Sequence, residues 1–273
     1  MVAGLLLFDL LFILLATLCH GSALAAGAWV YSALAARVPW PFAVVPAVYV
    51  GLLVLVAEVS LGTALCPRLR AGRFPLMKGA VFFSWTFRML LRRVVSVPGV
   101  KFLLFSNNLL RFLLLRGLGA RVAFSANMSS DVELLDPALL SVGAGAVLGA
   151  RTMISSHYID QGMLVLGEIH VGEGALLAFD VGCGPGVRIG RRASIRPRST
   201  VSVDVELGEG ANVGMASVLE AGVILGAGAR VSAGTFVPRG TRVQDGGRYP
   251  ARDVPLDEAI RASSTTSSAA PAV

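Results

Sequence analysis

The segment SSHYIDQGM, residues 155–163, is polar and carries side chains that can move protons. His157 has the side chain best suited to take a proton from a hydroxyl or an amine near neutral pH. Asp160 can orient the imidazole, or it can be a solvated turn residue. His170 is the competing base, although its place just before a regular repeat position predicts an exposed wall residue. The remaining alternative is that neither histidine acts.

Five arginines fall within eleven positions of the stretch PGVRIGRRASIRPRST. Guanidinium groups match phosphate oxygens, so a basic ladder of these side chains along one edge would bind a phosphate-bearing ligand. The alternatives are an edge that faces lipid headgroups, or pairing with Asp180, Asp204 and Glu206. The arginines are Arg188, Arg191, Arg192, Arg196 and Arg198.

Other chemistry is not indicated. The three cysteines, Cys19, Cys66 and Cys183, are far apart and show no metal-ligand spacing, so we expect small buried hydrophobic side chains and no metal site. No phosphate-binding glycine loop and no serine nucleophile elbow is present in the sequence. The net charge is +7, but no aromatic-and-basic module accompanies it, and we expect no nucleic-acid partner.

An aliphatic residue or Cys183 recurs at every sixth position from Val171 to Val243, and a small residue follows four positions after nearly every one. Six residues turn a helix by about 600°, which scatters these side chains, whereas six is a multiple of the strand period of two. Glycines demand a corner every few residues. The pattern predicts a solenoid of short parallel strands over 119–247, with three hexads in each coil of about 18 residues. Upstream, a looser phase runs through Phe124, Ser130, Asp136, Val142, Leu148 and Ile154.

The two phases do not join. Ile154 and Val171 are 17 residues apart, one short of three hexads. A slip of this kind forces a loop or a bulge out of the solenoid wall, and the polar segment with His157 is the predicted loop.

The first part of the chain has a different composition, and the whole sequence is 55% hydrophobic. Residues 1–67 predict a transmembrane helical hairpin, because each half is long and apolar enough to cross about 30 Å of hydrocarbon. More basic residues follow the second span than separate the two, which predicts cytoplasmic ends and a solenoid on the cytoplasmic side. A cleaved signal peptide is the alternative. Asp9, His20 and Glu58 lie within the spans, in a structural or a functional role.

Residues 68–118 predict amphipathic helices that lie in the headgroup plane with their arginines reaching outward. The alternative is that these helices span the membrane. Residues 248–273 end in ASSTTSSAAPAV, and we expect a disordered tail.

The hexads LGEGAN, LGAGAR and VSAGTF resemble the left-handed parallel β-helix of the hexapeptide-repeat acyltransferases. The resemblance implies a mainly β fold, a histidine general base at His157, and acyl coenzyme A or a phosphopantetheine thioester as donor. It also implies a homotrimer with its site between neighbours. The membrane helices and the histidine segment further resemble the terminal domains of ε-poly-lysine-synthetase-type non-ribosomal peptide synthetases.

These resemblances imply a membrane-anchored acyltransferase that moves an acyl group, such as acetyl, to a hydroxyl or an amine. The acceptor would be a small molecule or a carrier-bound group, and the protein would be surrounded by membrane lipid. The alternatives are a non-catalytic membrane-tethered scaffold and an amide-bond-forming domain that works with a peptide synthetase.

Overall fold

The computed structural model describes residues 2–250, which divide into two compact units. The first unit contains the chain up to Leu69 together with Met77–Ala120. The second contains Arg70–Leu76 and the chain from Arg121 onward. A short segment from between the helices thus belongs to the second unit.

The first unit begins with two long helices, α1 (Val2–Ala35) and α2 (Trp40–Ala64), each long and apolar enough to cross a bilayer. Glycines let the two helices approach closely. A Cβ on Gly27 would lie 2.9 Å from the Ala47 carbonyl oxygen, and one on Gly51 equally near that of Ala23. Small residues at such contacts are typical of helices that pack within membranes. The Glu58 carboxylate accepts a hydrogen bond from the Ser22 hydroxyl, so it joins the two helices.

Three helices complete this unit: α3 (Gly79–Val95), α4 (Pro98–Ser106) and α5 (Asn108–Gly117). The chain breaks at Asn107 because its side chain caps α5, accepting from the amides of Leu109 and Leu110. The expectation that the arginines reach outward is wrong for two of them. Arg111 is buried and donates to the Phe105 carbonyl, and Arg88 donates to carbonyls just after α2. Both guanidinium groups therefore donate hydrogen bonds to backbone carbonyls of the first unit.

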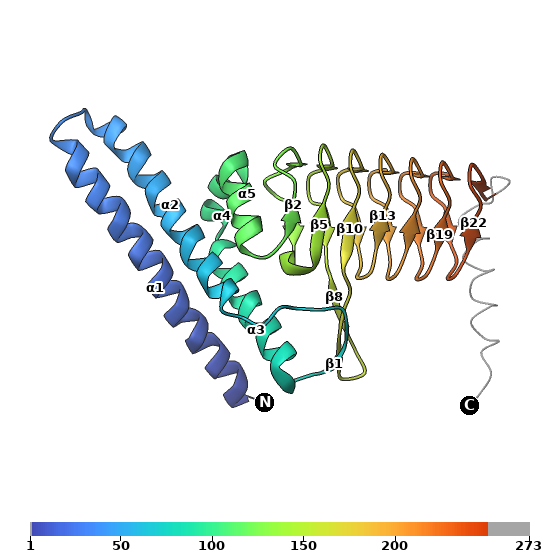
Figure 1. Ribbon diagram of the computed structural model, residues 1–273, viewed down its shortest axis with the longest axis horizontal. Helices are drawn as coiled ribbons and strands as arrows, with labels where there is room; N and C mark the ends of the chain where they lie inside the picture. The colour runs from blue at the N-terminus through green and yellow to red at the C-terminus, as the bar shows by residue number, and fades with distance from the viewer. Residues whose placement is uncertain (1, 251–273) are drawn as a thin grey trace. The chain divides into compact units, whose positions relative to one another are not determined.

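The second unit is the predicted parallel β-solenoid, whose coils stack from β2 to β22 in Figure 1. Each strand pairs in parallel with the strand one coil further along the same wall, as Thr200 does with Val218. The first wall holds β2 (Arg121–Val122), β5 (Leu140–Val142), β10 (Ile169–Val171), β13 (Arg188–Ile189), β16 (Glu206–Leu207), β19 (Ile224–Leu225) and β22 (Arg242–Val243). The second holds β3 (Asn127–Met128), β6 (Val147–Leu148), β11 (Leu176–Leu177), β14 (Ser194–Ile195), β17 (Asn212–Val213), β20 (Arg230–Val231) and β23 (Arg248–Tyr249). The third holds β4 (Glu133–Leu134), β7 (Met153–Ile154), β12 (Gly182–Cys183), β15 (Thr200–Val201), β18 (Val218–Leu219) and β21 (Phe236–Val237).

The hexad residues fill the interior of the column as predicted from Val171 to Val237, and nearly all are buried. Cys183 is one of them, and burial raises the pKa of its thiol to about 12. The thiol is therefore a core group and not a nucleophile at neutral pH.

The predicted upstream phase is wrong before Val142. The inward side chains are Val122, Met128 and Leu134, whereas Phe124 is exposed. A 3₁₀ turn, η1 (Pro137–Leu139), lengthens the chain between Leu134 and Val142, so the phase shifts there. Asp136, which the sequence pattern assigned to the core repeat, lies instead at a corner.

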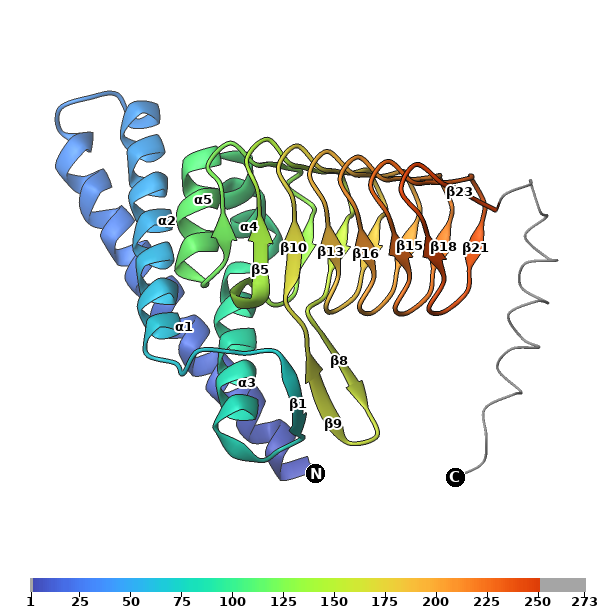
Figure 2. The ribbon, with the colours of Figure 1, turned by 45° about the vertical axis from the view of Figure 1, so that its right-hand side comes forward.

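A hairpin projects from the column where the register breaks, as predicted (Figure 1). Strands β8 (His157–Asp160) and β9 (Met163–Leu166) pair antiparallel, and β1 (Gly72–Pro75) pairs with the other edge of β9. Ile154 stacks on Cys183, and Cys183 in turn stacks on Val201. The coil from Ile154 to Cys183 is longer than the coil from Cys183 to Val201, because it contains the hairpin in addition to its three walls. The three-stranded sheet β1–β9–β8 is visible beside the coils in Figure 2.

The column extends slightly further than predicted. Strand β23 pairs with β20, so Arg248 and Tyr249 belong to the second wall and not to the tail. The rest of the expected disordered tail, 251–273, lies outside the described residues.

Candidate active site

Asp136 and His157 meet at the corner between the third wall and the first wall. Their Oδ2 and Nδ1 atoms are 2.6 Å apart. Asp136 follows β4 and directly precedes η1, whereas His157 begins β8 in the next coil. The 3₁₀ turn and the hairpin both depart from the regular coil at this corner, and these departures bring the two residues together.

The pair has the burial expected of an oriented base. The Asp136 side chain is 4% exposed and the His157 side chain is 22% exposed. A carboxylate only accepts hydrogen bonds, so Nδ1 carries the proton and donates it to Asp136. This fixes the tautomer in which Nε2 accepts a proton from a reactant. The arrangement can therefore perform general base catalysis.

Asp160, the predicted orienting residue, is placed elsewhere. Its Oδ2 lies 3.0 Å from Nη2 of Arg73 in β1. Side chains three apart on a strand point to opposite faces, so Asp160 and His157 leave β8 in opposite directions. The carboxylate that meets the His157 imidazole is Asp136, and Asp160 belongs to the hairpin's own contacts.

The backbone around His157 is held by its neighbours. The Ser155 hydroxyl donates to the His157 carbonyl at 2.8 Å, and the Gly167 amide donates to the Ser156 carbonyl at 2.9 Å. The Ser156 side chain is buried, and its hydroxyl has no hydrogen-bond partner within residues 2–250. Such a group is typically met by an ordered water.

One corner amide near the hairpin differs from its equivalents. In later coils the amides of Asp204 and Gly222 donate to the corner carbonyls of Pro185 and Val203. At Gly186 the hairpin replaces the corner below, and the Gly186 amide makes no hydrogen bond within the described part of the chain. A Cβ on Gly167 would lie 2.4 Å from this amide nitrogen, which places it at the hairpin base.

The predicted basic ladder is wrong. The register His170–Arg188–Glu206 shows that residues three hexads apart stack in adjacent coils, so five arginines within eleven positions are spread around a single coil. Arg191 and Arg192 pair with Glu173 and Glu209 at 2.6 Å, so glutamates on the adjacent coils neutralise them. Arg188, Arg196 and Arg198 are exposed.

Arg188 does border a groove. Its Nε is 3.9 Å from Glu206, and His170 lies beside it in the preceding coil. The groove of about 510 Å³ continues over the first wall and the next corner to Asp245. His170 in turn contacts Glu168, with 3.3 Å between Nε2 and Oε2. His170 is thus on the exposed wall, as its position predicted.

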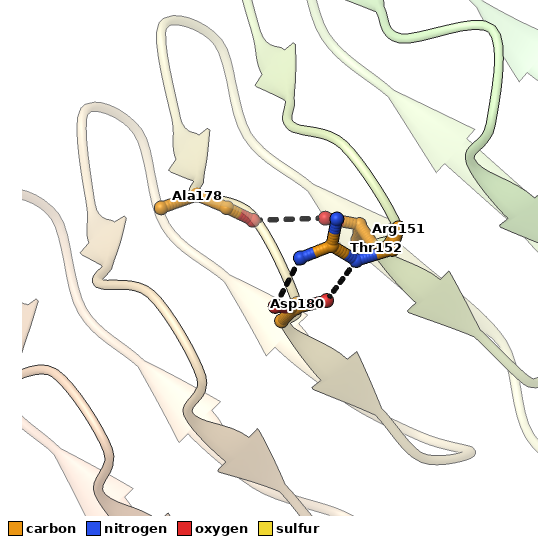
Figure 3. A network of polar contacts seen from close by, with 4 residues as sticks. All are labelled: Arg151, Thr152, Ala178 and Asp180. Atoms are coloured by element: carbon orange, nitrogen blue, oxygen red, sulfur yellow. Dashed lines mark hydrogen bonds and ion pairs between the residues drawn. The ribbon is translucent and has the colours of Figure 1, made fainter.

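Charges also alternate along the corner between the second and third walls. Arg151 donates from Nε and Nη2 to the two carboxylate oxygens of Asp180, both at 2.6 Å (Figure 3). The Arg151 guanidinium lowers the pKa of the Asp180 carboxyl below its usual value, and Arg198 contributes to the shift. At the corner between the first and second walls, the Arg192 guanidinium likewise lowers the pKa of the Glu209 carboxyl. These pairs link adjacent coils.

These pairs predict a pH dependence of stability. A carboxyl whose pKa is lower in the folded state stabilises the fold fully above its unfolded pKa of about 4. The contribution disappears as the pH falls through the lower folded value. We expect Asp180→Asn to lower the thermal midpoint at pH 7. Between pH 4 and pH 3, the thermal midpoint of this variant should fall less than that of the parent. Thermal unfolding followed by circular dichroism would measure both midpoints. Asp204→Asn is the control, since Asp204 has the same left-handed corner backbone and makes no ion pair within residues 2–250. Equal pH profiles for both variants would contradict the prediction.

The sequence pattern does not single out Asp136, because this residue falls on a position of the looser six-residue phase. The usable signal is an acidic residue at an aliphatic site followed by proline, a combination that fits a corner better than a wall. Among residues 2–250, no group of three or more His, Cys, Asp or Glu side chains is placed to hold a metal ion.

No family model matches the chain. Over 175 residues, 63% of this chain, it is 26% identical to the Delta-poly-L-ornithine synthetase of Acinetobacter baumannii (strain AB307-0294). The match spans 13% of that relative's length. The relative is a synthetase of a poly-amino acid, in line with the second resemblance.

Solved structures similar to the chain carry acyltransferase names. The acetyltransferase domain of PglB from Neisseria gonorrhoeae, in complex with acetyl coenzyme A, is 20% identical, with a TM-score of 0.40, over 52% of this chain and 65% of that one. The N-acyltransferase AntD from Bacillus cereus, in complex with dTDP and coenzyme A, is 15% identical, with a TM-score of 0.42, over 57% and 96%.

Proposed function

We propose that the protein is an acyltransferase in which His157 is the general base and Asp136 orients it. The observation that carries the proposal is the 2.6 Å contact between the His157 ring and a nearly buried carboxylate, on a hairpin that leaves a hexapeptide solenoid. The same geometry is what a base needs in order to hold one tautomer during a reaction.

In the reaction, a hydroxyl or amine attacks the carbonyl carbon of an acyl thioester, and Nε2 of His157 takes the proton that the attacking group loses. The new acyl–oxygen or acyl–nitrogen bond forms and the acyl–sulfur bond breaks. The proton then passes from the imidazole to the departing thiolate, so a free thiol leaves. The Gly186 amide, which makes no hydrogen bond within residues 2–250, is the candidate donor to the carbonyl oxygen as negative charge develops there.

The donor we propose is acyl coenzyme A or a phosphopantetheine thioester. The groove beside Arg188 and His170 offers the Arg188 guanidinium for a phosphate and the first wall of the column for the extended arm. Of the five predicted arginines, Arg188 fits this role best, because it is the one that lines the groove. Its contact with Glu206 is long, at 3.9 Å, whereas Arg191 and Arg192 pair with glutamates at 2.6 Å.

The surroundings we propose are the cytoplasmic membrane. Helices α1 and α2 have the length and composition of a hairpin anchor, and the basic residues that follow α2 favour the cytoplasmic side. A homotrimer is the assembly that the hexapeptide resemblance implies. Light scattering of the detergent-solubilised chain would measure it.

Asp136→Asn tests the mechanism. The amide preserves shape, but it can present a donor to Nδ1 and so favour the wrong tautomer. We expect kcat/KM for acyl-coenzyme A with a panel of amine and hydroxyl acceptors to fall by about 10²-fold. Asp131→Asn is the control, because it removes one carboxylate from an exposed corner of the same coil. Equal activity of Asp136→Asn and the control would reject the dyad.

Amide-bond formation is the second candidate, favoured by the similarity to part of a poly-ornithine synthetase. It uses the same base and an amine acceptor, such as a basic amino acid presented to a carrier-bound thioester. Turnover with carrier-bound thioester and none with coenzyme A thioesters would select it. No turnover with either donor would favour the non-catalytic membrane scaffold.

A further inference from the structure

Strand β1 comes from a distant part of the chain and completes the sheet that carries His157. It lies between α2 and α3 in the sequence, yet it pairs antiparallel with β9 in the register Gly72–Leu166 through Pro75–Met163. The hairpin therefore supplies the central strand and one outer strand of a three-stranded sheet, whose third strand precedes the solenoid in the chain (Figure 2).

Two further contacts fix β1 to the hairpin. The Leu76 amide donates to the Gly162 carbonyl in the hairpin turn, at 3.1 Å. The Arg73 guanidinium reaches Asp160 in β8, at 3.0 Å, although β1 pairs with β9 and not with β8. One short segment is thus bonded to both strands of the hairpin and to its turn.

The hairpin needs this support. Gln161 and Gly162 both have positive φ, at 44° and 76°, as in the two-residue turns that match the twist of paired strands. An isolated two-stranded hairpin is marginally stable in water even with a good turn, and a third strand satisfies the open edge of β9. Because His157 is the first residue of β8 and pairs with Leu166, the position of its ring depends on this sheet.

We propose that residues 72–76 are a positioning element of the active site, which holds the hairpin so that His157 stays in contact with Asp136. Arg73 and Asp160 are positioning residues in this arrangement, acting through β8. This inference rests on the proposed function, and it gives the segment between α2 and α3 a direct effect on turnover.

The decisive comparison is Leu76→Pro with Leu76→Ala in the full chain. Proline removes the amide that bonds to Gly162, whereas alanine keeps it. For Leu76→Pro we expect kcat to fall by about 10- to 100-fold, because small misplacements of a reacting group cost this much. The KM for the donor should stay within a few-fold, and the amides of 157–166 should exchange faster with deuterium. Leu76→Ala should resemble the parent in all three measurements.

A charge swap tests the ion pair. Arg73→Glu and Asp160→Arg should each lower kcat by roughly two- to five-fold, as expected for an exposed pair, and the double variant should recover activity.

The outcomes separate this inference from the proposed function. Full activity of His157→Ala would overturn the proposed function, and this inference with it. This inference alone would be overturned if His157→Ala is inactive while Leu76→Pro keeps an unchanged kcat despite faster deuterium exchange in the hairpin. Unchanged hairpin exchange in Leu76→Pro would also overturn it.

Discussion

His157→Ala should lower kcat/KM for acyl transfer by about 10²–10⁴-fold, the range for loss of a general base. The loss follows from chemistry and not from folding, since the ring is partly exposed and its contact with Asp136 is at a corner outside the aliphatic core. Steady-state rates from thiol release, with the same donor and acceptor for both proteins, would measure it.

His170→Ala is the matched control for this experiment. His170 lies in the first wall, its ring contacts Glu168 on the surface, and it borders the groove. We expect it to raise the KM for the donor and to leave kcat within a few-fold of the parent. A larger loss of kcat in His170→Ala than in His157→Ala would exchange their roles. Thermal midpoints within a few degrees of the parent would confirm that both variants are folded.

Gly208→Ala should be among the most damaging small substitutions in the column. An added Cβ would lie 2.5 Å from the Ala227 amide nitrogen and 2.6 Å from the Gly226 carbonyl carbon, both backbone atoms of the next coil. Neither can move without separating the coils. We expect the free energy of unfolding to fall by about 3 kcal/mol or more, as for severe overpacking. Denaturant titration followed by circular dichroism would measure this loss.

Gly210→Ala provides the comparison two residues away. It has a positive φ of 67°, and nothing lies within 4 Å of the position an added Cβ would take. Its cost is therefore backbone strain alone, about 1–2 kcal/mol. The reverse order of the two losses would show that the coils can separate at this corner, contrary to the close contacts described above.

The solenoid could be predicted from the sequence because a six-residue period fits strands and excludes helices, and because glycines mark the corners. The prediction held where every hexad is regular, from Val171 onward. It was wrong before Val142, since η1 lengthens one corner in a way that no local propensity signals strongly. The hairpin was predictable as an interruption, because the register slip at Ile154 had to leave the wall.

The candidate site was half predictable. His157 stood out as a histidine in the interruption, but its partner depends on which residues stack in neighbouring coils. The separation of Asp136 from His157 is 21 positions, which is not a whole number of hexads, so a repeat-based search passes over it. Strand β1 was also missed, because four residues that include a proline show no strand alternation. The left-handed winding came from the resemblance and not from the spacing.

The pairing of β1 with β9 has a consequence for the order of folding. Neighbouring coils close short loops, as the Thr200–Val218 pair does, whereas the Gly72–Leu166 pair closes a much longer one. Closure of a loop about five times as long costs roughly 1.5 kcal/mol more in entropy, so the strand should join after the column has formed and detach before it unravels. The chain would then become active only after its protected core had formed. Mild denaturant would abolish turnover while leaving the core intact.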